Sequence, residues 1–188
     1  MSYFRVKELM VPLAEYATVP AGSSLLEAML ALEKAQVEYD HTKYRHRGVL
    51  ILDKDKVVIG KLGQLDVLRA LEPKEDYADD IRNLHQFGFT SKFIQDVRKQ
   101  RRLRGAPLKD LCRKAATLKV EDFMQAPSEG EFIDEEASLE LAILQLVMGE
   151  HHLSLLVTRG QAIVGVLRMT DVFAAVFHAA KECEYTVQ

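Results

Sequence analysis

Features that mark secreted, disulfide-rich or membrane-spanning proteins are scarce in this chain of 188 residues. It has two cysteines, Cys112 and Cys183, and no CxxC motif, so no disulfide framework is expected. No apolar run approaches the roughly 18 residues that a transmembrane helix requires. The N-terminus carries Arg5, Lys7 and Glu8, whereas a signal peptide would need an unbroken apolar core there. We therefore expect a cytoplasmic protein with no membrane segment.

Motifs of catalysis and of metal binding are also missing. The sequence has no phosphate loop of the Walker type, no GxSxG, no HExxH and no GxGxxG. His151 and His152 are adjacent, and neighbours on a strand point to opposite faces, which makes them a poor pair of metal ligands. The run 53–55 (Asp-Lys-Asp) lacks the glycine and glutamate of a calcium loop and predicts a charged hairpin turn. We expect neither an enzyme nor a metal site.

The sequence does contain an internal duplication. Residues 6–10 (VKELM) match residues 120–124 (VEDFM) at an offset of 114, which also places Ser24 over Ser138. Further on, Gly60 matches Gly165 and Asp66 matches Asp171 at an offset of 105. The difference of nine residues fits an insertion in the first copy near residues 38–47. Each copy is small for an independent core, so we expect the two copies to pack on each other.

Each copy predicts the order strand, helix, strand, strand, helix. Ser24 followed by Glu27 is a capping box that starts the first helix. Apolar residues then recur at helical spacing, which predicts one apolar stripe on the first helix of each copy. Leu25, Ala28, Met29 and Leu32 form the stripe in the first copy, and Leu139, Ala142, Ile143, Leu146 and Val147 form it in the second. A second helix is expected to begin near Asp66, with Val67, Leu68 and Leu71, and near Asp171, with Val172, Phe173, Val176 and Phe177. The strands are expected at 18–20, 49–52, 57–62, 132–134, 153–157 and 162–167, with Gly160 in a turn.

This order, the M-x-x-P-like start and the spacing from Gly to Asp resemble the CBS domain, and the chain resembles a tandem CBS pair, or Bateman module. The resemblance implies an α/β fold in which two repeats pack about a pseudo-twofold axis, with a helical insertion between them. It divides the chain into a first repeat (1–72), a basic insertion (73–117) and a second repeat (118–188). Two such pairs often stack into a disc-shaped homodimer through their CBS faces.

The duplicated aspartates are the first candidates for a binding site. A carboxylate at the start of a helix can accept both hydroxyls of a ribose, or it can simply complement the positive end of the helix dipole. Ligand-binding CBS copies usually carry Ser or Thr three residues before the aspartate, where this chain has Gly63 and Arg168. Arg168 can grip a phosphate with its planar fork, or it can point to solvent or pair with an acid. The resemblance implies ligand contacts from Asp171, Arg168, Thr170, Phe132 and Ile133, and in the first copy from Asp66, Thr18 and Val19.

The insertion is the individual feature of this chain. Residues 92–114 hold nine Lys or Arg against two Asp, a net charge of +7 in a chain whose total is −3. Apolar residues there suggest two short helices broken at 105–107. We expect the segment to cover a face of the module or to extend a dimer contact. Binding of nucleic acid is the weaker alternative, because Phe93 is the lone aromatic residue in the basic run.

The resemblance thus implies a regulatory module that binds an adenine nucleotide such as AMP, ADP or ATP between the repeats and signals to an unidentified partner protein. The nucleotide is a ligand, and no cofactor is expected to be required. The alternative is a ligand-free scaffold for dimerisation.

Overall fold

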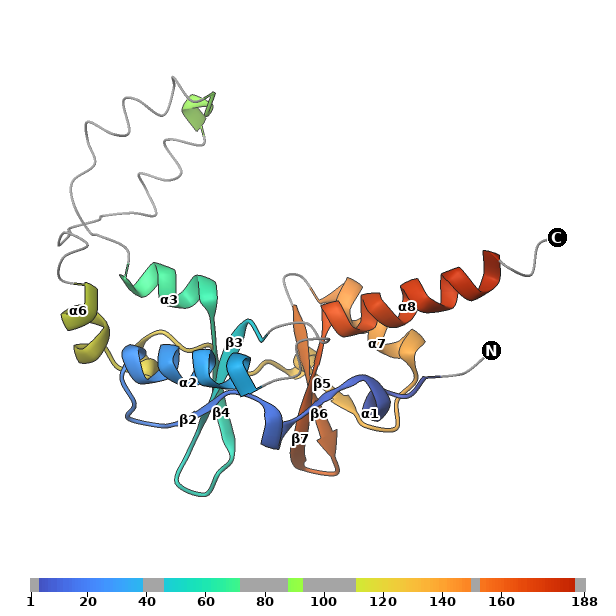
Figure 1. Ribbon diagram of the computed structural model, residues 1–188, viewed down its shortest axis with the longest axis horizontal. Coiled ribbons are helices and arrows are strands. Elements are labelled where there is room, and N and C mark those ends of the chain that lie inside the picture. Colours follow the sequence, from blue (N-terminus) through green and yellow to red (C-terminus); the bar gives the residue numbers. More distant parts are fainter. Residues whose placement is uncertain (1–3, 39–45, 72–87, 93–110, 150–152, 185–188) are drawn as a thin grey trace.

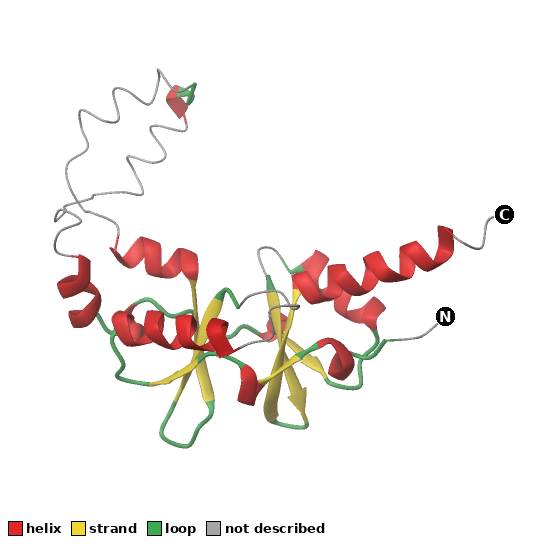
Figure 2. Cartoon of the chain, in the orientation of Figure 1, coloured by secondary structure: helices red, strands yellow, loops and turns green. Residues whose placement is uncertain are grey.

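The computed structural model describes residues 4–38, 46–71, 88–92, 111–149 and 153–184. Two sheets lie side by side, each with helices of its own (Figures 1 and 2). One sheet has the order β2-β3-β4 and the other the order β1-β7-β6-β5. The strands are β1 (Val11–Pro12), β2 (Thr18–Pro20), β3 (Gly48–Leu52), β4 (Val58–Gly63), β5 (Phe132–Asp134), β6 (Ser154–Arg159) and β7 (Ala162–Arg168).

The predicted order of elements in each repeat is confirmed. In both, a short strand pairs in parallel with the next strand, which then forms an antiparallel hairpin with the third. The α-helices are α1 (Val6–Leu9), α2 (Leu25–Glu38), α3 (Gln64–Leu71), α6 (Leu111–Thr117), α7 (Leu139–Met148) and α8 (Met169–Glu184). The described residues also form the 3-10 turns η1 (Leu13–Glu15), η4 (Val120–Asp122) and η5 (Glu129–Glu131). Among the described residues, no helix is long and apolar enough to span a membrane.

Local sequence signals place the ends of these elements as expected. At the start of α2 the Ser24 backbone N–H donates to Glu27 Oε2 at 2.6 Å, and the Glu27 N–H donates to Ser24 Oγ at 3.2 Å, which confirms the capping box. In the β3–β4 hairpin, Asp53 Oδ1 accepts from the N–H groups of Asp55 and Val57, both at 2.8 Å, so the charged turn is confirmed as well. Gly160 has a φ of +61° in the β6–β7 turn.

The two repeats exchange their leading segments. Residues 5–12 pack on the second repeat, where β1 pairs with β7 and the side chain of Val6 is buried in the core. In return, residues 118–125 pack on the first repeat, where Val120 is buried and Lys61 and Gln125 exchange two backbone hydrogen bonds of 2.9 and 2.8 Å. Because the matched segments cross in opposite directions, the core of each repeat is completed by the other.

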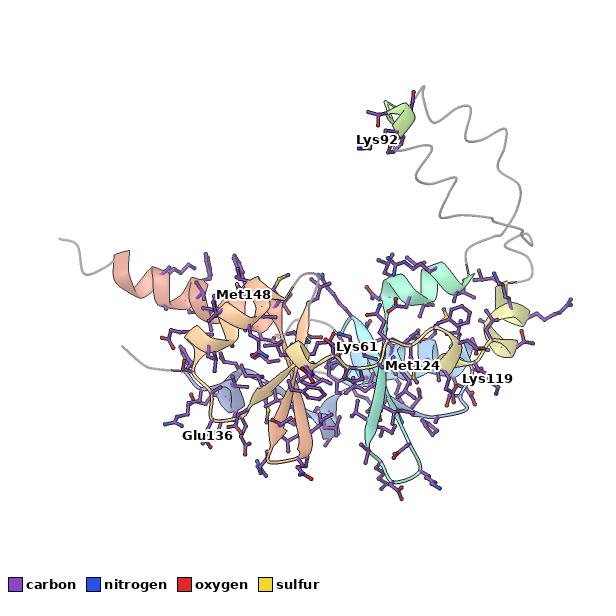
Figure 3. The ribbon with its side chains drawn as sticks, turned by 180° about the vertical axis from the view of Figure 1, so that it is seen from behind. Lys61, Lys92, Lys119, Met124, Glu136 and Met148 are labelled. Carbon is purple, nitrogen blue, oxygen red and sulfur yellow. The ribbon has the colours of Figure 1, made fainter. Side chains whose placement is uncertain are left out.

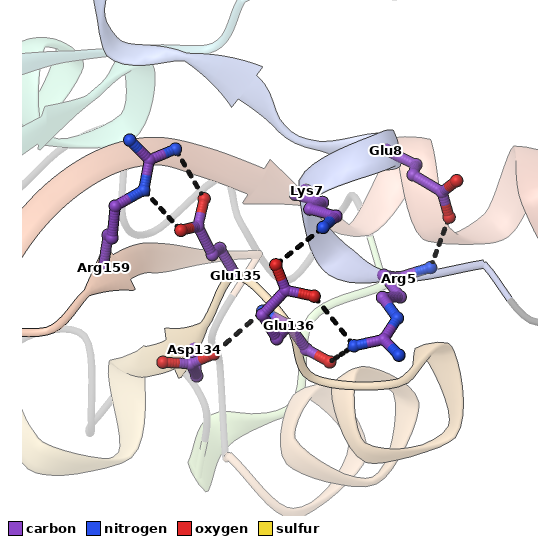
Figure 4. Close-up of polar contacts among 7 residues, drawn as sticks. All are labelled: Arg5, Lys7, Glu8, Asp134, Glu135, Glu136 and Arg159. Carbon is purple, nitrogen blue, oxygen red and sulfur yellow. Dashed lines mark hydrogen bonds and ion pairs between the residues drawn. The ribbon is translucent and has the colours of Figure 1, made fainter.

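Ion pairs and a hydrogen bond join the crossing segments to the opposite repeats at the surface. Glu136 accepts from Arg5 Nη1 at 2.7 Å and from Lys7 Nζ at 2.6 Å (Figure 4). The hydrogen bond from Lys7 is the main reason that the pKa of Glu136 lies below its usual value. On the other repeat, Lys119 Nζ donates to the Gly22 carbonyl at 2.7 Å. These side chains are exposed, so each pair adds little to stability.

A glycine on each third strand makes room for the exchanged segment. A Cβ atom on Gly165 would lie 2.6 Å from the Val11 carbonyl oxygen and 2.8 Å from Met10 Sδ. A Cβ atom on Gly60 would overlap the Met124 side chain, with its Cγ at 2.9 Å. The duplicated glycines therefore serve the close approach of the matched methionines that begin the two repeats.

The sheets meet through a third apolar cluster, which joins the two repeat cores. Leu50 and Val58 from the first repeat pack with Leu156 and Val166 from the second, and all four are buried. Tyr16, just after η1, packs against the same cluster. The expected packing of one copy on the other is therefore present.

Some residues of the predicted apolar stripes, and some apolar residues of the second helices, lie at the surface. Leu25, Ala28, Ala142 and Val172 are buried as expected. Other apolar residues of these helices are exposed, because none of the described elements covers their side of the helix. These exposed residues are Met29, Leu68, Val147, Phe173, Val176 and Phe177.

The insertion lies mostly outside the described residues, including both predicted helices up to residue 110. Its last part forms α6, which packs on α2 and α3. Ala115 is buried in the core of the first repeat, and Leu111 packs against that core. The end of the insertion thus contributes to the first repeat.

Candidate ligand pocket between the repeats

A small cavity of about 140 Å³ lies where the two repeats meet. The start of β3 and the end of β4 form one side, and the start of β6, the end of β7 and the first residues of α8 form the other. Matched positions of the two copies, such as Gly63 and Arg168, therefore both line it. The cavity is built by the packing of the repeats and belongs to neither alone.

Positive charge dominates the ionisable lining of this pocket. Arg47, Lys61 and Arg168 line it, together with the hydroxyl-bearing residues Ser154 and Thr170. Lys61 Nζ forms an ion pair of 2.9 Å with Oε1 of the buried Glu131. Cations and hydroxyl groups are donors to oxyanions, so the lining is suited to a negatively charged group.

Arg168 is held by Asp171 in a bidentate ion pair. Its Nε and Nη2 atoms donate to Oδ2 and Oδ1 of Asp171, both at 2.6 Å. The two side chains are 6% and 14% exposed. This geometry arises because β7 runs directly into α8, so that the last residue of the strand lies one turn before Asp171. Of the alternatives for Arg168, pairing with an acid is the one observed, and both groups are largely buried.

Asp66, the counterpart of Asp171, is engaged in a different way. Its Oδ2 accepts the Gly63 backbone N–H at 2.9 Å, and its Oδ1 accepts Gln125 Nε2 at 2.9 Å. The carboxylate therefore caps the start of α3 and holds the leading segment of the second repeat. Neither Asp66 nor Asp171 lines the cavity itself. The two aspartates were expected to line the cleft between the repeats. Neither lines this pocket, because each carboxylate turns toward donors of its own chain.

The remaining predicted contacts lie on the edge strands. Thr18 and Val19 are in β2 and Phe132 and Ile133 are in β5, each at the edge of its sheet, and none of them lines the pocket. The Phe132 carbonyl accepts Gln145 Nε2 at 2.7 Å, and the Ile133 carbonyl accepts Thr158 Oγ1 at 3.3 Å. The structure thus brings Arg168 and Thr170 to the pocket, with Asp171 attached through Arg168.

Residues that the sequence did not single out complete the surroundings. Tyr16 lines the pocket, and its ring meets the buried ring of His46 edge to face, with 4.8 Å between centroids. Burial raises the pKa of Tyr16 to about 12. Burial, and secondarily the charge of Arg168, lowers the pKa of His46. The one sequence signal that could have pointed to this pocket is the charged Lys61 inside a predicted strand. His46 and Arg47 lie in the polar stretch attributed to an insertion.

Comparison with known proteins identifies the fold, and it identifies a CBS domain in the first repeat. The CBS domain family model matches residues 6–73. A CBS domain-containing protein of unknown function from Bacillus anthracis str. Ames Ancestor superposes with a TM-score of 0.58 at 15% identity, covering 93% of this chain and 94% of that one. The CBS-pair protein CBSX2 from Arabidopsis thaliana superposes with a TM-score of 0.59 at 16% identity, covering 96% of this chain and 99% of that one. A structure of CBSX2 in complex with AMP superposes with a TM-score of 0.59 at 18% identity, covering 93% of this chain and 97% of that one.

No curated protein sequence matches the chain. The family match identifies a CBS domain at residues 6–73, and the likeness to solved structures over both repeats shows the fold of a CBS pair. Proteins of this kind are in general regulatory modules that bind ligands and do not themselves catalyse reactions.

Proposed function

We propose that this protein is a regulatory module that binds an adenine nucleotide in the pocket between its repeats, acts as a homodimer and signals to a partner protein. The observation that carries the proposal is the cationic pocket, to which both repeats contribute Arg47, Lys61 and Arg168. A ligand held there touches both repeats at once. It can therefore favour one arrangement of the pair over another, which is what a sensor requires.

The size of the pocket suggests how binding proceeds. Ligand sites usually enclose about 300–1,000 Å³, and the cavity of about 140 Å³ has room for a phosphate group rather than a whole nucleotide. A phosphate that takes the planar fork of Arg168 releases Asp171 from its ion pair. The freed carboxylate can then accept the hydroxyls of a ribose. The AMP complex of CBSX2 supports an adenine nucleotide as the ligand.

Titration calorimetry with AMP, ADP, ATP and adenosine tests this proposal. We expect at least one nucleotide to bind, and Arg168→Ala to weaken its affinity at least tenfold, about 1.4 kcal/mol. Arg159→Ala is the matched control, because Arg159 also forms a bidentate pair with an acid, Glu135, but does not line the pocket. If every compound gives the heat of buffer alone, the protein is not a nucleotide sensor.

The second candidate function is a ligand-free scaffold that dimerises through its CBS faces. The observation in its favour is that both duplicated aspartates already have donors within the chain. A protein that forms stable dimers and shows no thermal shift with any of the four compounds supports it. The division into repeats 1–72 and 118–188 with an insertion at 73–117 stays part of the proposal. Nucleic-acid binding by residues 92–114 gains no support, since most of that segment lies outside the described residues.

A further inference from the structure

The first repeat contains a second cavity, which is larger than the pocket between the repeats. It encloses about 420 Å³ between α2, α3 and the β3–β4 hairpin. This volume lies within the range of about 300–1,000 Å³ that ligand sites usually have, whereas the pocket between the repeats is smaller. Apolar side chains make up most of the lining, among them Ala28, Met29, Leu32, Val67 and Leu68. We call it the apolar cavity, and the pocket between the repeats the cationic pocket.

The two cavities share part of their walls. Val49, Leu62 and Gly63 line both of them. Val49 pairs with Leu62 across the β3–β4 hairpin, and Gly63 pairs with Gly48, which lines the cationic pocket. At the border of the cavities the hairpin therefore ends in two paired residues without side chains. A Cβ atom on Gly63 would lie 3.2 Å from Asp66 Oδ2, so a larger residue there would crowd this border.

A short stretch of backbone before β3 ties the walls of the two cavities together. Arg47 lines the cationic pocket, and its carbonyl accepts the backbone N–H of Gln64, which lines the apolar cavity, at 3.1 Å. The His46 carbonyl accepts Nε2 of Gln36, another residue of the apolar cavity, at 2.9 Å. The C-terminal end of α2 and the N-terminal end of α3 lie toward the middle of the molecule (Figure 1), and Lys61 of the cationic pocket lies near the middle as well (Figure 3). The two cavities therefore adjoin each other at the end of the hairpin.

Charge distinguishes the two cavities. Three cationic side chains line the cationic pocket, whereas Glu33 is the one ionisable group among the described residues that line the apolar cavity. An anionic group is therefore favoured on one side of the glycine pair and disfavoured on the other. The apolar cavity offers the amide of Gln64 instead, and a glutamine amide can accept from the amino group of adenine and donate to its ring nitrogen.

We propose that the apolar cavity receives the base of a nucleotide whose phosphate lies in the cationic pocket. This inference rests on the proposed function, in which the phosphate lies at Arg168 and the ribose at Asp171 but the base has no position. The charges fix the direction of the ligand, because the uncharged base suits the apolar lining and the phosphate suits the cations. Gly63 is then the point at which the ligand crosses from one cavity to the other. A nucleotide held in this way contacts α2 and α3 of the first repeat as well as α8 of the second.

Titration calorimetry of the full chain first compares AMP with ribose 5-phosphate, which lacks the base. A base adds about ten non-hydrogen atoms of contact, so we expect AMP to bind about 100-fold more tightly than ribose 5-phosphate. Equal affinities would overturn the inference and leave a phosphate site at Arg168 standing. If no nucleotide and no sugar phosphate binds, the proposed function fails, and the position of the base fails with it.

Two tryptophan variants test whether the base lies in the apolar cavity. The chain has no tryptophan, so an introduced indole is a single fluorescent reporter. Leu68 lines the cavity and is 65% exposed, and Leu65, on the same helix and 57% exposed, lines neither cavity. We expect AMP to quench the emission of Leu68→Trp, because a base stacks on an indole ring, and ribose 5-phosphate to leave it unchanged. Leu65→Trp is the matched control and should respond to neither compound.

The outcomes of this comparison are distinct. Loss of AMP binding in Leu68→Trp, with ribose 5-phosphate binding kept, would support the same position, because the indole then fills the cavity. AMP that binds to Leu68→Trp as it binds to Leu65→Trp, with no change in emission, would overturn the inference. Both sites are exposed, so circular dichroism should show an unchanged fold.

Photoaffinity labelling with 8-azido-AMP locates the base directly. After digestion and mass spectrometry, we expect the label in the peptides that contain α2 (25–38) or α3 (64–71). An excess of AMP should abolish this label, which controls for chance reaction at the surface. A label confined to peptides of the second repeat would contradict the position of the base and leave nucleotide binding between the repeats intact.

Discussion

Arg168 shows how one residue changes the character of a site. Its fork fills both oxygens of Asp171, so the carboxylate is not open to a ligand until the arginine moves. Removing one partner of a buried ion pair typically costs about 3–5 kcal/mol, because a charge is left buried without compensation. A phosphate can replace Asp171 as the partner of Arg168, so ligand binding exchanges one ion pair for another instead of breaking it.

His46 makes the stability of the protein depend on pH. Its ring is buried against Tyr16, and that burial lowers its pKa from 6.5, with a further contribution from Arg168. Asp171 and Glu15 act in the opposite direction. The unfolded chain therefore binds a proton more readily than the folded one, and stability that is present above pH 6.5 is lost as the pH falls through the lowered pKa.

We expect the free energy of unfolding, measured in urea, to fall below pH 6.5 by at most about 1.4 kcal/mol per pH unit from this one group. His46→Gln should flatten this slope, and the same change at the exposed His178 should not. Glu135 and Glu136 also contribute to the pH dependence, because their pKa values are lowered from 4.5. The stability that these two carboxylates contribute is lost only at more acidic pH, where they become protonated. A His46→Gln variant with the slope of the wild type would contradict the prediction.

At the scale of elements, β4 and β7 are shaped by what crosses them. In β7 the obstacle to any side chain at position 165 is the backbone oxygen of Val11, which belongs to the paired strand β1. In β4 the obstacle at position 60 is the side chain of Met124, which can rotate. The two matched glycines therefore differ in how strictly they are required.

We expect Gly165→Ala to lower the free energy of unfolding by about 1–3 kcal/mol, since overpacking forces the backbone to shift. Gly60→Ala should cost less. The sign of the change in the free energy of unfolding is informative, because replacing glycine by alanine within a regular element is otherwise stabilising.

Gly130→Ala is the control for both, as nothing lies within 4 Å of a Cβ atom there. Urea unfolding of the three variants measures these differences. A Gly165→Ala variant as stable as the Gly130→Ala control would show that β1 is not packed on β7.

At the scale of the whole molecule, the exchange of leading segments joins two small repeats into one cooperative unit. Val6 belongs to the first copy in sequence and to the core of the second in space, and Val120 does the reverse. The clusters meet through Leu50, Val58, Leu156 and Val166. Each copy alone would lack part of its core and would expose the surface on which the other packs.

We therefore expect a single unfolding transition. Val6→Ala and Val120→Ala should each lower the free energy of unfolding by about 2 kcal/mol, since both valines are fully buried. Circular dichroism and fluorescence of Tyr16 and its neighbours should report the same midpoint. Two transitions, with each variant shifting a different one, would mean that the repeats fold independently.

Local signals in the sequence were sufficient for much of the fold. The offset of 114 residues predicted which segments are equivalent, and the capping box of Ser24 and the turn at Asp53 formed as expected because their donors and acceptors lie within four residues of each other. β-rich runs joined by polar turns, and apolar residues at helical spacing, predicted the order of elements, because such patterns depend only on residues close together in the sequence.

Contacts between distant residues were decided only by the tertiary structure. The aspartates were correctly placed at the starts of α3 and α8, yet their partners Gln125 and Arg168 depend on how the segments cross. The same holds for the pocket and for the exposed stripe of α8, whose apolar residues look like core in sequence. The sequence by itself determined what each segment becomes, because short-range bonds and periodicity suffice for that. Which segments touch was determined by the packing of two copies that complete one another.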